Sequence, residues 1–346
     1  MIRYLLPKEG KFYKANLPCH SVLSDGKKTP EQLKEMYKNH GYSVLAITDH
    51  EFMVDHTDMT EPDFLMLNGY EAYVKEQTDP TRMGRYMKTA HINFIAKDPT
   101  VRKHIMVDAA YQKYSVRTMK VEDLPRVGDI TVRQYTPGDI NRMVRQANEN
   151  GYFAFYNHPV WSRENRPVVL QYEGFIGTEV YNHGVYNTEG YSGDDGKAYD
   201  DFLQAGRRMY PFCNDDNHNK FPDDSPLCDS FGGFNMIKAE KLDYATIVDA
   251  ILKGDFYCSY GPTIDELYME DDTVHITFPE AGEVFLVTEG RASAPGRCPH
   301  VVAKKGESLT EASFQILPED RYFRLEVVDH EGHKAFTRAF FLEDLK

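Results

Sequence analysis

Six short apolar segments, each with polar side chains at or near one end, constrain the fold of this chain more than any other feature. They read as β-strands and cover residues 43–50, 63–74, 91–98, 152–159, 175–182 and 208–218. Helix-like segments lie among them at residues 29–41, 136–151 and 243–254. Thr29 can cap the first of these helices, Pro30 suits its first position and Gly41 can end it. Strands that alternate with helices in this way predict an α/β fold.

The pattern of apolar and polar residues changes after the segment GDFYCSYGP. The segments TVHITF, EVFLVTE, YFRLEVVDHEG and KAFTRAFFLE are short, alternate apolar with polar residues and are separated by turn residues. This pattern predicts an α/β domain at residues 1–262 followed by a small all-β domain at residues 263–346. Within the first domain, residues 100–134 show weaker periodicity, and we expect irregular structure that covers a site there.

Charge and composition narrow the classes of partner. The 346-residue chain has a formal net charge of −14, which argues against binding to long nucleic acids or to anionic membranes. The opening MIRYLLPKEGKFYK is too short in its apolar part for a secretory signal, so we expect a cytoplasmic protein. The five cysteines form no C-x-x-C pair and are expected to be reduced. Whether the chain forms a homo-oligomer is left open.

Histidines and carboxylates recur at the ends of the predicted strands. Strand ends in a parallel α/β barrel meet on one face, where loops can pool side chains that are distant in sequence. The candidates are His20, Asp25, Asp49, His50, Glu71, His91, His158, Asp216 and His218. Imidazole and carboxylate groups together suit zinc, manganese and iron. A single histidine is more often a hydrogen-bonded structural residue, but the shared position at strand ends favours a metal site.

Several of these residues lie in motifs that resemble one protein family. The stretch NLPCHSVLSDG, followed by a helix and by ITDH, resembles the opening of the polymerase and histidinol phosphatase (PHP) family, whose usual pattern is H-x-H-S-x-x-S-D-G and then T-D-H. The later segments GYEAY, AHINFIA, YNHPVW and NDDNH are similar to further motifs of that family. The resemblance spans roughly residues 12 to 262.

This resemblance implies a distorted (β/α)7 TIM-like barrel that holds two or three divalent ions (Zn, Mn or Fe). It assigns Glu71, His91 and His158 to one ion, Glu71 as a bridge with His20 and Asp216 to a second, and Asp25, His50 and His218 to a third. Asp49 is not assigned as a ligand; it precedes the ligand candidate His50 and is expected to orient a ligand from outside the coordination shell. Arg163, Asn182, His183 and Arg85 are candidates for contact with substrate.

One family position departs from the pattern. Pro18 stands where the first histidine of H-x-H is usual. Cys19 is a poor replacement, because successive strand side chains point to opposite faces and only positions 18 and 20 share the inward one. The second ion is therefore expected to bind with a vacant coordination position, or to bind weakly.

The resemblance implies a metal-dependent phosphoesterase that hydrolyses a small phosphorylated metabolite or nucleotide. The nucleophile would be a metal-bound water held by Glu71, His158 and Asp216. Two alternatives are a hydrolase of a carboxylic ester or carbamate bond at the same centre, and a catalytically decayed module that binds metal or ligand.

The departure at position 18 gives a direct test of the motif alignment. Replacing Pro18 by histidine is expected to increase the number of ions bound per chain, because the new imidazole would face the second ion. Elemental analysis of the repleted variant and the natural protein measures this. An unchanged metal content would contradict the alignment.

Overall fold

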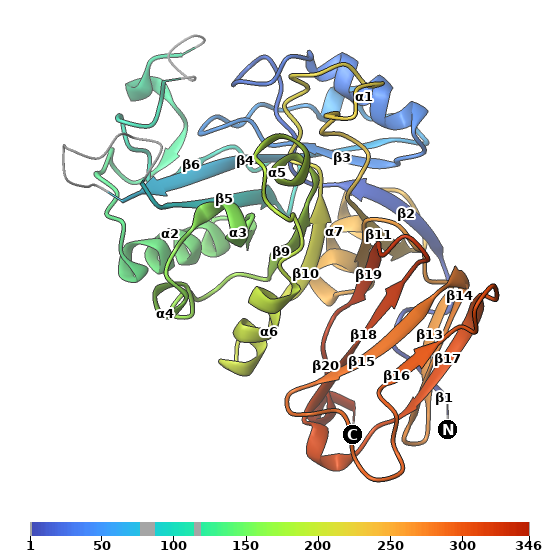
Figure 1. Ribbon diagram of the computed structural model, residues 1–346. Coiled ribbons are helices and arrows are strands. Elements are labelled where there is room, and N and C mark those ends of the chain that lie inside the picture. Colours follow the sequence, from blue (N-terminus) through green and yellow to red (C-terminus); the bar gives the residue numbers. More distant parts are fainter. Residues whose placement is uncertain (1, 77–86, 114–118, 346) are drawn as a thin grey trace.

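The computed structural model describes residues 2–76, 87–113 and 119–345. The chain forms a mixed α/β structure with one large curved sheet and one small antiparallel sheet (Figure 1). The C-terminal strands, orange to red, gather beside the α/β part, and both chain termini lie near them (Figure 1). The α/β architecture predicted from the sequence is thus confirmed at this level.

The large sheet begins with the strands of the α/β part. Its neighbours in order are β10 (Tyr210–Asn214), β9 (Gly177–Asn182), β8 (Tyr152–Tyr156), β5 (Thr89–Ala96), β4 (Leu65–Lys75), β3 (Val44–Ile47), β2 (Lys11–Asn16), β11 (Phe234–Ala239) and β12 (Phe256–Ser259). Strands β3, β5 and β8 are buried along their whole length, as expected for a sheet covered on both faces.

The parallel arrangement expected of the strands is wrong in two places. Strand β11 runs antiparallel to both β2 and β12. Strand β5 runs antiparallel to both of its neighbours, β4 and β8. The other pairs from β2 to β4 and from β8 to β10 are parallel. Because β5 is reversed, its first residues, and not its last, lie at the edge where the other strands end.

The two ends of this part of the sheet approach each other. The Asp216 amide donates to the Pro18 carbonyl at 3.2 Å, and the His20 amide donates to the Asn217 carbonyl at 3.0 Å. On β11, the Asn235 side-chain amide donates to the Cys213 carbonyl of β10 at 3.0 Å. These bonds bring the segments after β2 and β10 side by side. A closed (β/α)7 barrel remains a prediction.

Helices cover the sheet, and the three helices that the sequence predicts lie within the expected ranges 29–41, 136–151 and 243–254. The helices are α1 (Pro30–Asn39), α2 (Pro137–Glu149), α3 (Pro159–Ser162), α4 (Arg166–Val169), α5 (His183–Thr188), α6 (Gly196–Gln204) and α7 (Tyr244–Lys253). Thr29 caps α1 in a capping box with Gln32. Gly254 ends α7 with a φ of +72°, a conformation that favours glycine. Ile247 and Ile251 of α7 are fully buried against the sheet.

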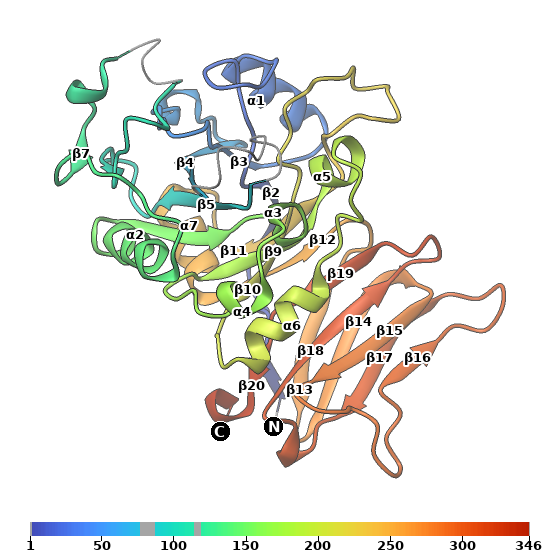
Figure 2. The ribbon, with the colours of Figure 1, turned by 60° about the vertical axis from the view of Figure 1, so that its left-hand side comes forward.

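The C-terminal strands form a second, separate apolar core. The small sheet orders β1 (Ile2–Tyr4), β13 (Glu266–Glu270), β14 (Thr273–Ala281) and β17 (Leu309–Gln315). The large sheet continues past β12 through β19 (Lys334–Thr337), β18 (Tyr322–Val328), β15 (Glu283–Thr288) and β16 (His300–Val302), with β20 (Phe340–Phe341) beside β18. Figure 2 shows these two layers facing each other. The N-terminal strand β1 therefore belongs to the C-terminal layers.

An irregular segment follows β5, as the weak periodicity of residues 100–134 predicted. It contains only the short elements β6 (His104–Ile105), η4 (Val121–Asp123) and β7 (Arg126–Val127) among its described residues. Arg133 at its end is fully buried and donates to Glu51 through both terminal nitrogens, at 2.6 and 2.8 Å. This buried ion pair ties the segment to the loop after β3.

Breaking that pair should destabilise the fold. Arg133→Ala leaves the Glu51 carboxylate buried without its cation, and the free energy of unfolding is expected to fall by about 3–5 kcal/mol. Arg208→Ala, which removes an exposed arginine paired with Glu343 and Asp344, should cost less than about 1 kcal/mol. Urea denaturation compares the two variants. Similar losses in both would contradict the importance of the buried pair.

Candidate metal centre

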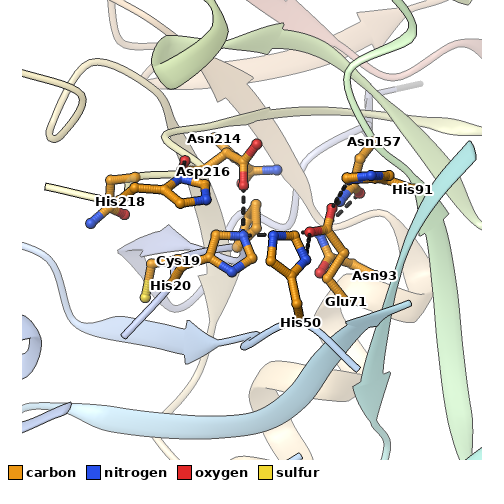
Figure 3. Close-up of polar contacts among 12 residues, drawn as sticks. Cys19, His20, His50, Glu71, His91, Asn93, Asn157, Asn214, Asp216 and His218 are labelled. Atoms are coloured by element: carbon orange, nitrogen blue, oxygen red, sulfur yellow. Dashed lines mark hydrogen bonds and ion pairs between the residues drawn. The ribbon is translucent and has the colours of Figure 1, made fainter. Parts of the chain in front are cut away.

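Eight side chains gather at the edge where the central strands end. Three groups of potential ligand atoms lie within 4.8 Å of one another: Glu71, His91 and His158; His20, Glu71 and Asp216; and His20, Asp25, His50 and His218. Figure 3 shows most of these side chains converging from different strands. The eight residues are those that the sequence motifs selected, and they share one location. Their role as metal ligands remains a proposal.

Glu71 lies at the centre of the cluster, on β4. Its Oε1 atom lies 3.2 Å from His91 Nδ1 and 3.7 Å from His158 Nε2. Its Oε2 atom lies 2.9 Å from His50 Nδ1 and 3.5 Å from His20 Nε2. One fully buried carboxylate therefore faces four imidazole rings, which is the arrangement that a bridging ligand needs.

The reversed strand and two strained residues bring distant side chains to this carboxylate. His91 is the third residue of β5 and reaches the centre because β5 starts at the edge where β4 passes Glu71. His158 and Asp216 have positive φ values of 27° and 53°, which are uncommon for residues with a β-carbon. Such strain persists where the surrounding structure imposes it, and it clusters at functional sites.

Three imidazole rings of the cluster stack on one another, and two carboxylates contact them. The ring of His20 stacks on those of His50 and His218, with centroids 4.3 and 4.4 Å apart. Asp25 Oδ1 lies 3.3 Å from His218 Nε2 and 3.7 Å from His50 Nε2. Asp216 Oδ1 lies 2.9 Å from His20 Nε2. Acid and imidazole groups thus alternate across the site.

The centre shifts the pKa values of its members in opposite directions. Burial lowers the pKa of His50 and His158, but contact with the negatively charged Glu71 outweighs burial and raises both pKa values to about 9. Burial dominates for His91 and lowers its pKa to about 4. The pKa of Glu71 is lowered, since the charges of His91 and His50 outweigh its burial.

The donor set fits a divalent cation. Two nitrogens face the buried Oε2 atom of Glu71, which takes part in no hydrogen bond of regular geometry with a described residue. A buried polar atom without such a partner is costly, and a bound cation would satisfy it. Imidazole nitrogens and carboxylate oxygens are accepted by zinc, manganese and iron alike.

Asp49 supports the cluster by holding a loop. It accepts hydrogen bonds from the Ser21 amide at 2.8 Å, the Ser21 hydroxyl at 2.6 Å and the Ser24 hydroxyl at 2.5 Å. These bonds fix the loop between His20 and Asp25. The structure thus places Asp49 behind two ligand candidates other than its chain neighbour, His50.

Sequence reasoning missed the buried polar residues behind the centre. Glu179 Oε2 accepts from the His158 amide at 2.8 Å and from the Asn182 side chain at 2.9 Å. Burial raises the pKa of Glu179 to about 7. The Asn157 side chain donates to Glu71 Oε1. Asn157 lies in the N-H-P motif and so carried a sequence signal. For Glu179, the one available signal was an acidic residue inside the apolar segment FIGTEVYN.

The four candidates for substrate contact have different surroundings. Asn182 is buried, caps α5 and donates to Asp216 Oδ2 at 3.2 Å. The His183 ring lies 2.9 Å from the Tyr181 hydroxyl and 3.1 Å from the Asn187 amide. Arg163 is exposed and follows α3. Arg85 lies outside the described residues. Substrate contact by any of the four remains a prediction.

A pocket of about 250 Å³ opens over the ligand candidates. Trp161 forms one wall, with its ring 5.0 Å from that of His91 and 4.9 Å from that of His158. Tyr73, Lys75, Lys113, Glu189 and Lys220 also line it. His20 is fully buried beneath this pocket.

Pro18 and Cys19 have different surroundings in the structure. The Pro18 carbonyl accepts from the Asn16 side chain at 3.0 Å as well as from the Asp216 amide. The Cys19 thiol lies 3.5 Å from the Ala46 carbonyl, in an apolar cluster with Leu45 and other core residues. Cys19 is in none of the three ligand groups, as expected, although it lies outside β2, which ends at Asn16.

Comparison with known proteins gives structural matches only. No family model matches the chain, and no curated protein matches it. A two-domain protein from Bacteroides vulgatus containing a predicted PHP-like metal-dependent phosphoesterase is 14% identical, covers 98% of both chains and has a TM-score of 0.47.

Two further solved structures are similar. A protein from Bifidobacterium adolescentis, provisionally assigned as a metal-dependent phosphoesterase, is 15% identical over 71% of this chain and 95% of its own, with a TM-score of 0.36. An amidohydrolase from Chromobacterium violaceum, with bound sulfate and no metal, is 16% identical over 62% and 93%, with a TM-score of 0.37. One of these descriptions names a PHP-like protein, and two name metal-dependent phosphoesterases. All three TM-scores lie below 0.5.

Within the described ranges, no helix has the length and apolar character needed to cross a membrane.

The raised histidine pKa values predict how metal affinity depends on pH. At pH 7 the metal-free protein holds protons on His50 and His158, whose pKa values are about 9, and these must leave before a cation binds. Affinity for Zn²⁺ or Mn²⁺ should therefore rise steeply between pH 7 and about 9 and level off above. Competition with a chelator across this pH range measures the metal affinity. His50→Gln should reduce the slope by about one proton, and a flat profile in the natural protein would contradict the site.

Proposed function

We propose that this protein is a metal-dependent phosphoesterase that hydrolyses a small phosphorylated metabolite or nucleotide. The observation that carries the proposal is the shared position of Glu71 in two of the three ligand groups. A carboxylate shared by two groups holds two cations close together, and paired cations are typical of enzymes that cleave phosphate esters. The proposal includes closure of the large sheet into the barrel that the motifs imply.

The chain would hold two or three divalent ions through the eight side chains. Such ions, when bound, lower the pKa of a coordinated water and neutralise charge on phosphoryl oxygens. The missing ligand at Pro18 leaves one group, His20, Glu71 and Asp216, with a single imidazole. This poor donor set supports an open coordination position there, as in catalytic sites.

The residues around the ligands would fix their geometry. Asn157 holds one oxygen of Glu71, and Asn182 holds one oxygen of Asp216. Glu179 fixes the backbone at His158, where φ is positive. Partners of this kind set ligand orientation, and their loss typically lowers metal affinity or activity by about 10–100-fold.

The size and composition of the pocket support a small substrate. A volume of about 250 Å³ suits a small phosphate ester, and the net charge of −14 disfavours a long nucleic acid. Trp161 and Tyr73 restrict the mouth next to the ligand candidates. A small phosphorylated molecule is therefore the proposed partner.

Hydrolysis of model substrates tests the proposal. After repletion with Zn²⁺ or Mn²⁺, the protein should cleave p-nitrophenyl phosphate or bis-p-nitrophenyl phosphate faster than p-nitrophenyl acetate. Glu71→Gln should lower kcat/KM by about 100-fold or more, since it removes the shared carboxylate. His330→Gln, at an exposed histidine in the turn between β18 and β19, should leave the rate unchanged.

Two results would contradict the proposal. Cleavage of the acetate ester alone would identify a carboxylic ester hydrolase at the same centre. A protein that retains no metal after repletion would identify a ligand-binding module in place of an enzyme.

A further inference from the structure

The two ring nitrogens of His158 have different surroundings. Nε2 faces the centre, 3.7 Å from Glu71 Oε1 and 3.7 Å from Asp216 Oδ2. Nδ1 lies 3.4 Å from the hydroxyl of Ser162, a buried residue at the end of α3. One nitrogen is thus available to a cation, while the other lies against a buried hydroxyl group.

Hydrogen bonds continue from Ser162 to a carboxylate. The Tyr156 hydroxyl is hydrogen-bonded to Ser162 and donates to Glu164 Oε2. The other oxygen of Glu164, Oε1, accepts from the hydroxyl groups of Tyr135 at 2.7 Å and Tyr172 at 2.5 Å. Three phenol groups therefore surround one carboxylate. We call Ser162, Tyr156 and Glu164 the Glu164 network.

The direction of donation in the Glu164 network follows from its last member. All three phenols donate to Glu164, so the single proton of the Tyr156 hydroxyl points to the carboxylate. Tyr156 then accepts from Ser162, and Ser162 accepts from the Nδ1–H group of His158. Only this order satisfies both contacts of Ser162 with its one proton. It keeps a proton on Nδ1 and leaves Nε2 as the nitrogen that can bind a cation.

The backbone after β8 turns back on itself to assemble the network. Tyr156 is the last residue of β8, and the Ser162 amide donates to the His158 carbonyl at 3.1 Å. Arg163 then has a positive φ of 54°, which is uncommon for a residue with a β-carbon. This turn places Glu164 beside the Tyr156 hydroxyl, eight residues earlier in the sequence.

Such a network can orient the His158 ring and strengthen it as a ligand. A ligand histidine usually donates its second N–H group to a carboxylate, carbonyl or water, which fixes the ring and raises the basicity of the ligand nitrogen. Here two hydroxyl groups stand between the imidazole and the carboxylate, and donation in one direction polarises each group in turn. The 3.4 Å contact is long for a hydrogen bond. A cation on Nε2 would make the Nδ1–H group a stronger donor to Ser162.

We propose that Ser162, Tyr156 and Glu164 are positioning residues, which hold the His158 ring with Nε2 toward a cation at Glu71. None of the three residues belongs to a ligand group or lines the pocket. They act on the cation through His158 alone. The inference rests on the proposed function for the presence of the cation, and it goes further by assigning a role to residues outside the centre.

The ring proton of His158 tests the network without any metal. A buried imidazole N–H group that donates a hydrogen bond exchanges slowly with water, so its proton should be visible by NMR of the metal-free, ¹⁵N-histidine-labelled protein. Its absence in His158→Gln assigns the signal. Ser162→Ala removes the acceptor and should speed the exchange about tenfold or more, since a hydrogen bond to a charged group contributes at least that factor. Equal exchange rates in Ser162→Ala and the natural protein would overturn the proposal.

Metal affinity separates positioning from general stability. Ser162→Ala and Tyr156→Phe should weaken the binding of one Zn²⁺ per chain by about 10–100-fold, measured by competition with a chelator, and Glu164→Gln should act in the same direction. Tyr172→Phe is the matched control, because it also removes a buried phenol that donates to Glu164 but lies outside the path to His158. In urea denaturation it should lose stability to an extent similar to Tyr156→Phe, while its affinity for Zn²⁺ stays unchanged. Equal losses of affinity in the two tyrosine variants would contradict a positioning role.

The outcomes for the network and for the proposed function are distinguishable. If Ser162→Ala shows faster exchange and weaker Zn²⁺ binding, but the natural protein cleaves no phosphate ester, the proposed hydrolysis is wrong and the positioning role stands. If phosphate esters are cleaved, and Ser162→Ala matches the natural protein in exchange and affinity, the hydrolysis stands and the positioning role is wrong. If the natural protein binds no Zn²⁺, both are wrong.

Discussion

The arrangement of the site depends on a single buried carboxylate, Glu71, whose negative charge the surrounding groups must compensate. An isolated charge in the interior costs several kcal/mol, and nearby opposite charges must compensate it. In the metal-free protein, protonated imidazoles supply that compensation, which is why the pKa values of His50 and His158 rise to about 9. Cations that displace those protons would take over the same role. Metal binding and protonation therefore compete for one carboxylate.

The backbone is arranged to meet this constraint. Strand β5 is reversed so that its beginning, with His91, reaches the edge where the neighbouring strands end. Positive φ values at His158 and Asp216 turn two further side chains toward the centre. Amides and a second buried acid, Glu179, hold these turns in place. The strain at the ligands is thus compensated by hydrogen bonds immediately behind them.

Sequence alone indicated which residues come together, because strand ends in an α/β sheet share an edge. His20, Glu71 and His158 were selected in this way and lie in one cluster. The helix ends were also predictable, since Thr29 and Gly254 have local roles as cap and stop. These features depend on residue type and spacing, which are visible in a sequence.

Other features depend on pairing between distant segments and were not predictable. The direction of β5 is fixed by its neighbours β4 and β8, not by its own residues. Strand β1 joins the C-terminal layers through pairing with β13, which no local pattern indicates.

The central claim is that the eight side chains enclose divalent cations beside Glu71. Diffraction data collected at the absorption edges of zinc, manganese and iron, from crystals of the protein as purified, test it most directly. The account predicts anomalous peaks on both sides of the Glu71 carboxylate, within bonding distance of the surrounding imidazoles. Ordered density for these side chains without any anomalous peak among them, in crystals grown with added metal, would contradict it.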